Sequence, residues 1–117
     1  MNKTYRIKKN EEIKALIDKR TTVGNQHFTV YYQRTSAESF RFAVSVNKKW
    51  GTAPERNKMK RRIRDVVSRS KDQLHQIDFL IVTKATTKGI GFEKIKESLS
   101  SLLMKLVRIG EQNETKI

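Results

Sequence analysis

The sequence predicts an α+β fold, an α/β sandwich in which a small mixed sheet of about four strands packs with three helices. Apolar residues recur at helical spacing in three segments, and β-branched and aromatic runs lie between them. The resulting order of helix, strands, helix, strand and helix is typical of one sheet covered by helices. With 117 residues, of which 36% are hydrophobic, the chain suits one modest core. We therefore expect a single domain over residues 1–110 and a polar, disordered tail over residues 111–117.

The first helix is expected over residues 11–19. Asn10 is a candidate N-cap, and two glutamates follow it in the first turn, where negative charge favours the helix dipole. Ile13, Leu16 and Ile17 have the i, i+3, i+4 spacing of one buried stripe. The segment therefore predicts a short amphipathic helix.

Strands are predicted in the next third of the chain, beginning with a short one around Val23. The runs 27–32 and 40–46 are rich in β-branched and aromatic residues and partly alternate with polar ones. Residues 35–39 are polar and have the composition of a turn. We therefore expect the two runs to form a hairpin.

The clearest helix start in the sequence lies at Thr52. Thr52 is a candidate N-cap, Glu55 stands three residues later as in a capping box, and Pro54 suits the first turn. This helix is predicted to run to about Gln73.

The last third of the chain predicts one strand and one helix. Residues 78–83 are nearly all apolar, so we expect them to form a central strand. A final helix is predicted over residues 92–109 and is expected to end at Gly110. Its apolar side comprises Ile95, Leu99, Leu102, Leu103 and Leu106.

The charge of the chain indicates a polyanionic partner. Lys and Arg number 26 and Asp and Glu number 12, so the formal net charge is 26 − 12 = +14. Such a charge repels itself on a small body, and phosphates neutralise it while releasing counterions. Only two acids, Glu55 and Asp65, oppose the ten basic residues of the segment 47–71, which are Lys48, Lys49, Arg56, Lys58, Lys60, Arg61, Arg62, Arg64, Arg69 and Lys71.

A helical projection of this basic segment separates apolar from charged residues. One stripe, which must face the sheet, comprises Met59, Ile63, Val66, Val67 and Leu74. The residues roughly opposite are Asn57, Lys60, Arg61 and Arg64, and the flank comprises Lys58, Arg62, Asp65 and Arg69. Ordinary solvated helices interleave acids at i+4, which this one hardly does. We therefore interpret it as a rigid cationic surface for a polyanion.

Several other classes of protein fit the sequence less well. The chain has no cysteine, and no apolar run approaches the roughly 20 residues that span a bilayer. No signal peptide is visible at the N-terminus, so we expect a cytoplasmic protein. A membrane-surface helix would carry Trp, Phe or Leu opposite its cations, whereas Trp50, the one tryptophan, falls in an expected loop.

The basic segment resembles a known family, the bacterial ribonuclease P proteins. Residues 48–64 read KKWGTAPERNKMKRRIR, which is similar to that family's signature of two lysines, a glycine, an alanine, Arg-Asn-Arg, Lys-Arg and a further Arg. The resemblance continues in order over about residues 5–107. Further matches lie at residues 6–9, at Glu12, and in the three strand segments 25–31, 40–46 and 78–83.

The chain departs from the family pattern at a few positions. Lys58 replaces the second arginine of Arg-Asn-Arg, which keeps the charge but loses the planar fork. Ile13 and Ile17 stand where phenylalanines are common, Asn47 replaces a small residue, and Pro54 replaces a valine.

The resemblance implies an αβββαβα order with a left-handed βαβ crossover around the basic helix, an exception to the usual hand. It also implies a subunit of an endoribonuclease ribonucleoprotein, in which an RNA removes the 5′ leader of precursor tRNA. The RNA would hold most of the Mg²⁺, and no catalytic side chain, protein-bound metal, organic cofactor, membrane or obligate protein partner is expected. The two histidines, His27 and His75, lie far apart in the sequence and read as structural residues.

Two RNA-binding surfaces follow from the resemblance. The catalytic RNA would contact Lys48, Lys49, Arg56, Asn57, Lys58, Lys60, Arg61 and Arg64. The single-stranded leader would lie in a cleft between the first helix and the sheet, lined by Ile13, Ile17, Phe28, Tyr31 and Val46. Ordinary core packing is an equal alternative for the two isoleucines. Because Phe28 and Tyr31 are three apart, they point to opposite faces of a strand, and the resemblance favours Tyr31 for the cleft.

Two other binding functions remain open from the sequence. A ribosomal or ribosome-assembly protein without enzymatic role would show the same charge pattern. A DNA-binding protein fits less well, because no second helix is predicted to pack on the basic helix as in a helix-turn-helix.

Overall fold

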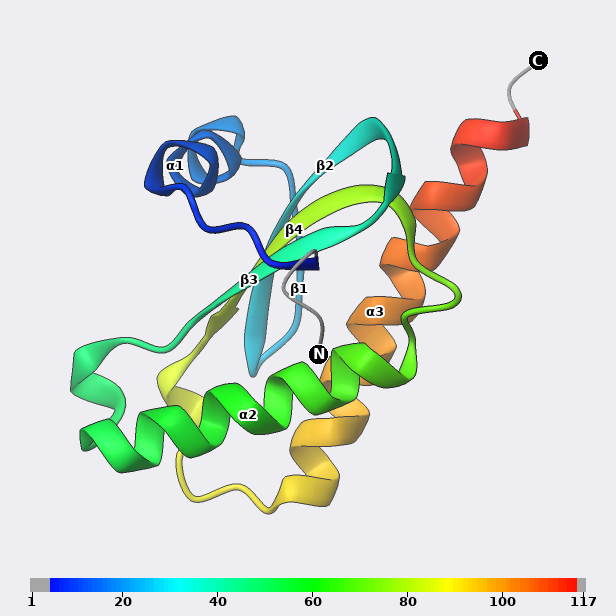
Figure 1. Cartoon of the computed structure of the whole chain (residues 1–117). Coiled ribbons are helices and arrows are strands. Elements are labelled where there is room, and N and C mark those ends of the chain that lie inside the picture. The colour runs from blue at the N-terminus through cyan, green and yellow to red at the C-terminus, as the bar shows by residue number, and fades with distance from the viewer. Residues whose placement is uncertain (1–4, 116–117) are drawn as a thin grey trace.

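The computed structural model describes residues 5–115, with side chains to residue 110, and confirms the α+β fold of three helices and a four-stranded mixed sheet. Figure 1 shows the elements in chain order. The bounds are α1 (Asn10–Lys19), β1 (Thr22–Gly24), β2 (Phe28–Ser39), β3 (Arg41–Ser45), η2 (Lys48–Trp50), α2 (Ala53–Arg69), β4 (His75–Thr83), η3 (Ala85–Thr87) and α3 (Phe92–Thr115).

The sheet has the strand order β1-β2-β4-β3. Strand β2 is antiparallel to both β1 and β4, whereas β3 and β4 run parallel. The apolar strand β4 lies between β2 and β3, which confirms its expected central position. Because α2 connects the adjacent parallel strands β3 and β4, the three elements form the expected βαβ unit.

The predicted hairpin between residues 27–32 and 40–46 is wrong. Residues 35–39 are not a turn but continue β2, and only Phe40 separates β2 from β3. Ser39 pairs with His75 at the start of β4, and Arg41 pairs with Asp78 on the other side of that strand. The chain therefore passes over the beginning of β4, which separates the two strands.

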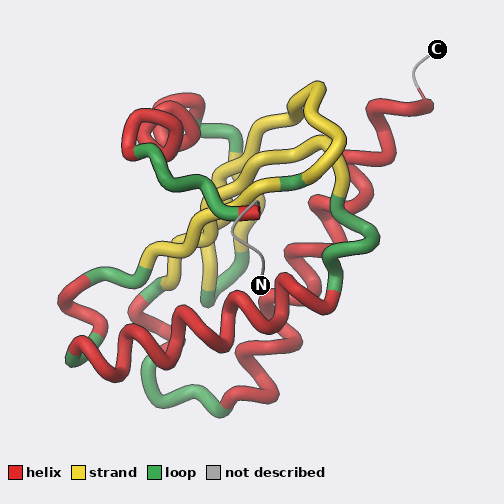
Figure 2. The backbone as a smooth tube through the Cα atoms, in the orientation of Figure 1, coloured by secondary structure: helices red, strands yellow, loops and turns green. Residues whose placement is uncertain are grey.

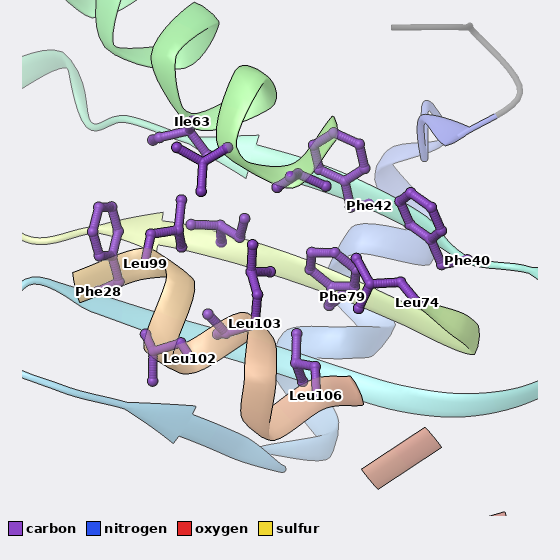
Figure 3. Packing of buried hydrophobic residues seen from close by; sticks show 14 of the residues in the cluster. Phe28, Phe40, Phe42, Ile63, Leu74, Phe79, Leu99, Leu102, Leu103 and Leu106 are labelled. Atoms are coloured by element: carbon purple, nitrogen blue, oxygen red, sulfur yellow. The ribbon is translucent and has the colours of Figure 1, made fainter. Parts of the chain in front are cut away.

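Helices cover both faces of the sheet, with α2 and α3 on one face and α1 on the other (Figure 1). The main core lies between α2, α3 and the sheet, where the labelled phenylalanines of the strands meet the aliphatic side chains of both helices (Figure 3). Four fully buried members, Phe28, Phe42, Phe79 and Ile81, come from three different strands. This core fixes the position of α2.

The second face carries a much smaller apolar cluster. Its buried members are Ile7, Leu16 and Leu80, and Ile13 and Tyr31 pack against them half-buried. Helix α1 therefore rests on the sheet through one buried leucine and a rim of partly exposed residues.

The helix bounds differ from the prediction in three places. Lys9 is the N-cap of α1 and makes no side-chain capping bond, so Asn10 is the first helical residue instead. Helix α2 ends at Arg69, and turns follow it up to Gln73. Helix α3 passes through Gly110 to Thr115, so the expected disordered tail begins as helix.

Gly110 has a packing role in the helix. A Cβ atom at this position would lie 2.9 Å from the carbonyl oxygen of His75. The glycine therefore lets α3 approach the start of β4 closely.

Within residues 5–115, the structure has no helix that is long and apolar enough to cross a membrane.

Candidate nucleic-acid interface

The N-terminus of α2 is fixed by the capping box that the sequence predicts. The Thr52 hydroxyl accepts a hydrogen bond from the backbone N–H of Glu55, and the Glu55 carboxylate accepts one from the backbone N–H of Thr52, at 3.3 and 2.8 Å. Hydrogen bonds from Thr52 hold the pKa of the Glu55 carboxyl below its ordinary value. The first turn of the helix is therefore well defined, and with it the direction of the side chains that follow.

The apolar stripe of α2 is buried as predicted. Met59, Ile63, Val66 and Val67 are at most 3% exposed, and Leu74 is buried in the turn region after the helix. The charged residues consequently lie on the other sides of α2.

The charged residues of α2 divide into two flanks when they are projected at roughly 100° per residue. We call the first the open flank; it comprises Arg56, Asn57, Lys60, Arg61 and Arg64. All five are exposed or half-buried. We call the second the paired flank; it comprises Glu55, Lys58, Arg62, Asp65 and Arg69.

The two flanks differ in how their charge is neutralised. Both acids of α2 lie on the paired flank, where the Arg69 guanidinium lies 3.1 Å from the Asp65 carboxylate. Arg62 on the same flank stacks over the ring of Phe92, 5.0 Å from its centre. The open flank carries four cations and no acid. Lys58 belongs to the paired flank, which sets it apart from the other helix residues of the predicted interface.

Arg6 extends the open flank, and the sequence analysis did not include it among the site residues. The N-terminal segment runs beside β3, where the backbone N–H of Ile7 donates to the carbonyl oxygen of Phe42 at 2.9 Å. This places Arg6 next to Arg61 and Arg64, around a hollow of about 270 Å³ that Asp65 and Ser68 also line. The signal was present in the sequence, because Arg6 opens the basic run 6–9.

The cations around this hollow are crowded. Burial, and after it the nearby Arg6, lower the pKa of the Arg64 guanidinium. The Nε atoms of Arg6 and Arg56 are buried and lack a hydrogen-bond partner among the described residues. A phosphate at this surface would relieve the repulsion between the guanidinium groups. The open flank is therefore electrostatically and geometrically suited to an anionic chain.

The basic loop before α2 is held in a defined shape. Lys48 and Lys49 are exposed in η2, whose first turn is capped by the side chain of Asn47. Trp50 ties this loop to the segment after β4, since its Nε1 donates to the Thr87 hydroxyl at 2.8 Å. The half-buried Trp50 therefore connects two loops, and Lys48 and Lys49 extend from a segment whose backbone is held in place.

The α1 face carries only part of the predicted leader cleft. Ile13 and Tyr31 are half-buried on this face and Ile17 is 42% exposed. Phe28 and Val46 were predicted to join them but belong to the main core, where they are 0% and 7% exposed. Because side chains alternate along a strand, Phe28 shares its face with Val30, and Tyr31 points to the other side. We define the α1 face as Ile13, Ile17, Tyr31, Ala43 and Val82.

The histidines lie in different surroundings. His27 is buried, and its Nδ1 lies 2.9 Å from the Ser98 hydroxyl. His75 is exposed at the start of β4. Among the residues that the structure describes, no three His, Cys, Asp or Glu side chains gather where they could hold a metal ion.

The fold and the charge distribution define a class of protein: a small basic α+β module in which one helix buries an apolar stripe and presents a flank of cations suited to a polyanion. Comparison with known proteins specifies the family. The family model described as Ribonuclease P matches residues 1–107. The ribonuclease P protein component of Streptococcus pneumoniae is 32% identical over 123 aligned positions, which cover 100% of this chain and 99% of that protein. The chain therefore belongs to the ribonuclease P protein family.

Solved structures agree with this assignment. A Staphylococcus aureus RNase P protein mutant with defective mRNA degradation activity is 34% identical, with a TM-score of 0.82 over 88% of each chain. The RNase P protein from Thermotoga maritima is 22% identical, with a TM-score of 0.75 over 88% of this chain and 96% of that one, which shows the shared fold. The family is one of RNA-binding proteins in tRNA processing, within a ribonucleoprotein.

Proposed function

We propose that this protein is the subunit of ribonuclease P that binds the catalytic RNA and the 5′ leader of precursor tRNA. In this role it assists the endonucleolytic removal of the leader, which forms the mature 5′ end of the tRNA. Its site of action is the cytoplasm. The observation that carries the proposal is the open flank of α2, which has four cations, no acid and the additional cation Arg6 beside it.

The open flank contacts the backbone of the catalytic RNA. The planar guanidinium group of arginine can donate two parallel hydrogen bonds to one phosphate. The buried stripe holds α2, and therefore these arginines, in a fixed position. Lys48 and Lys49 continue the contact from the loop before the helix. Lys58, on the paired flank, contributes charge from the side of the helix.

The α1 face holds the leader. A single strand needs apolar or aromatic side chains for its bases and cations along its phosphates. Tyr31 offers a half-buried ring, and Ile13 and Ile17 offer apolar contact without stacking. Because isoleucines stand here in place of aromatic residues, this part of the surface offers no ring for stacking and discriminates less between bases of the leader.

The chemistry of cleavage belongs to the RNA. Mg²⁺ would be held mainly by the RNA partner, where it would supply an activated water and charge stabilisation at the scissile phosphate. The part played by this chain is electrostatic, because its cations lower the repulsion between two polyanionic RNAs. They also keep the leader beside the catalytic RNA, which raises the local concentration of the substrate.

Reconstitution tests the proposal. Purified protein mixed with bacterial ribonuclease P RNA should increase cleavage of precursor tRNA at low Mg²⁺, and should favour substrates with a leader over those without one. The matched control is a small basic ribosomal protein at equal concentration and similar net charge. Stimulation equal to that of the control would contradict the proposal and favour a ribosomal or ribosome-assembly role.

A further inference from the structure

Arg41 joins three elements of the fold through its guanidinium. Its Nη2 lies 2.6 Å from Glu12 Oε2 of α1 and 2.8 Å from Asp78 Oδ2 of β4. Its Nε donates a second hydrogen bond to Asp78 Oδ1 at 3.3 Å. One arginine on the edge strand β3 thereby connects the sheet to α1.

The two carboxylates have different roles in this arrangement. Asp78 is 8% exposed and faces Arg41 directly across the parallel pair of β3 and β4. Because a buried carboxylate without a partner is costly, we expect the Arg41–Asp78 contact to stay formed. The hydrogen bonds that the guanidinium donates to Asp78, and then to Glu12, raise the pKa of Arg41, which therefore stays charged. Glu12 is half-exposed and reaches Arg41 from the helix, so its contact can open without disrupting the sheet.

Helix α1 has few other means of attachment to the sheet. One leucine of the helix, Leu16, is buried, and the N-cap residue Lys9 makes no side-chain capping bond. A ten-residue helix is only marginally stable by itself in water. The position of α1 therefore depends strongly on the few contacts at its first turn, where Glu12 lies.

Arg41 does not add to the cationic surface for RNA. One guanidinium faces two carboxylates, so the cluster has a net charge of −1 and gives phosphates no net attraction. Its location nevertheless borders the α1 face, because Ala43 follows two residues later on the same side of β3. The cluster therefore acts through the geometry of α1.

We infer that Arg41 is a positioning residue, which holds α1 through Glu12 at the spacing where the α1 face accepts a single-stranded RNA leader. This inference rests on the proposed function. When the Arg41–Glu12 contact opens, α1 leaves the sheet part of the time. The apparent affinity for the leader is then the intrinsic affinity multiplied by the fraction of molecules that remain competent, while the open flank of α2 is unaffected.

The test uses Glu12→Gln and, as its matched control, Glu11→Gln. Both variants remove one negative charge from the first turn of α1, but Glu11 is exposed at the neighbouring position. Three quantities are measured: hydrogen exchange of the α1 amides, affinity for ribonuclease P RNA, and the ratio of affinities for precursor tRNA with and without a leader.

Glu12→Gln should accelerate exchange in α1 and lower the leader ratio by about two- to fivefold, with RNA affinity within about twofold of wild type. Glu11→Gln should leave the exchange rates and the ratio unchanged. Faster exchange with an unchanged leader ratio would overturn the inference and leave the proposed function intact. A wild-type protein that does not distinguish the two substrates would instead contradict the leader-binding part of the proposed function.

A second variant separates position from charge. Arg41→Lys keeps the positive charge but cannot bond both carboxylates with a planar fork. It should reduce the leader ratio as Glu12→Gln does. A Lys variant with the full wild-type ratio and wild-type exchange in α1 would also overturn the inference.

Discussion

The two faces of the sheet differ in how firmly they hold their helices. Among the described residues, the cluster beneath α2 and α3 contains nineteen buried hydrophobic side chains, whereas the cluster beneath α1 contains three. Figure 2 shows the same difference in the backbone, with two long helices on one side of the strands and one short helix on the other.

Under the proposed function, this difference suits the two faces to separate tasks. Binding of a large structured RNA benefits from cations that are fixed before contact, and the main core fixes α2. Binding of a single strand of variable sequence benefits from a surface that can adjust, and the thin cluster beneath α1 permits this. Rigidity and adaptability are thus located on opposite sides of one small sheet.

The same substitution on each face gives the largest effects and tests the comparison directly. Leu103→Ala in the main core should lower the free energy of unfolding by about 3–5 kcal/mol, because it leaves a cavity among well-packed neighbours. Leu16→Ala should cost less, about 2–3 kcal/mol, because α1 can shift to fill the space. Chemical denaturation of both variants provides the measurement. Equal losses would mean that the two clusters are equally rigid.

Two adjacent tyrosines sharpen the comparison at the level of binding. Tyr31 lies on the α1 face and Tyr32 packs against the main core. Tyr31→Leu should weaken binding of a leader-containing substrate by about 1–2 kcal/mol, since it removes a ring on which a base can stack. Tyr32→Leu should leave that affinity unchanged and lower stability instead. Fluorescence titration with leader-containing and leaderless substrates checks this, and a reversed result would exchange the roles of the two faces.

The capping box of α2 gives a smaller effect. Thr52→Ala removes the side-chain acceptor of the first turn and should cost about 1 kcal/mol in thermal unfolding. Thr52→Ser keeps a hydroxyl at that position and serves as the control. If the alanine variant were as stable as the serine variant, the cap would not be what defines the start of α2.

The smallest expected effect is a pH dependence at the same cap. The pKa of Glu55 in the folded protein lies below its ordinary value of 4.5. Its contribution to stability is therefore complete above pH 4.5 and is lost as the pH falls through the folded-state pKa. The difference in melting temperature between wild type and Glu55→Gln should shrink on going from pH 7 to pH 3. A difference that stays constant over this range would contradict the assignment.

Features with a local cause were predictable from the sequence. The start of α2 follows from Thr52, Pro54 and Glu55, whose bonds form within one turn. The buried stripe of the same helix follows from the spacing of its apolar residues. The central position of β4 follows from its nearly continuous run of apolar residues. Each of these depends on neighbours along the chain or on simple burial.

Features with a distant cause were not predictable. The false hairpin arose because strand order depends on β4, which enters the sheet more than thirty residues later in the chain. Gly110 has the appearance of a helix end, and only the closeness of His75 shows why a glycine lies within α3. Likewise, alternation predicts that Phe28 and Tyr31 point apart, but the packing of helices decides which face is core.

The sequence predicted which residues of α2 form its exposed cationic side, but it did not predict the residues at the margins of this side. Arg6 stands in a basic run of the sequence, but its place beside the open flank comes from backbone pairing with β3, a contact between distant segments. The family resemblance placed Val46 in the leader cleft, but this residue continues the core side of β3.

The central claim is that the open flank of α2, and not the helix as a whole, binds RNA. The most direct test is the salt dependence of binding to ribonuclease P RNA for Arg61→Ala/Arg64→Ala and for Arg62→Ala/Arg69→Ala, which each remove two cations from α2. The first variant should reduce the slope of log K against log salt by about 1–2, because about two phosphate contacts are lost, and the second by less than about 0.5. Equal reductions, or a larger one for the second variant, would contradict the claim.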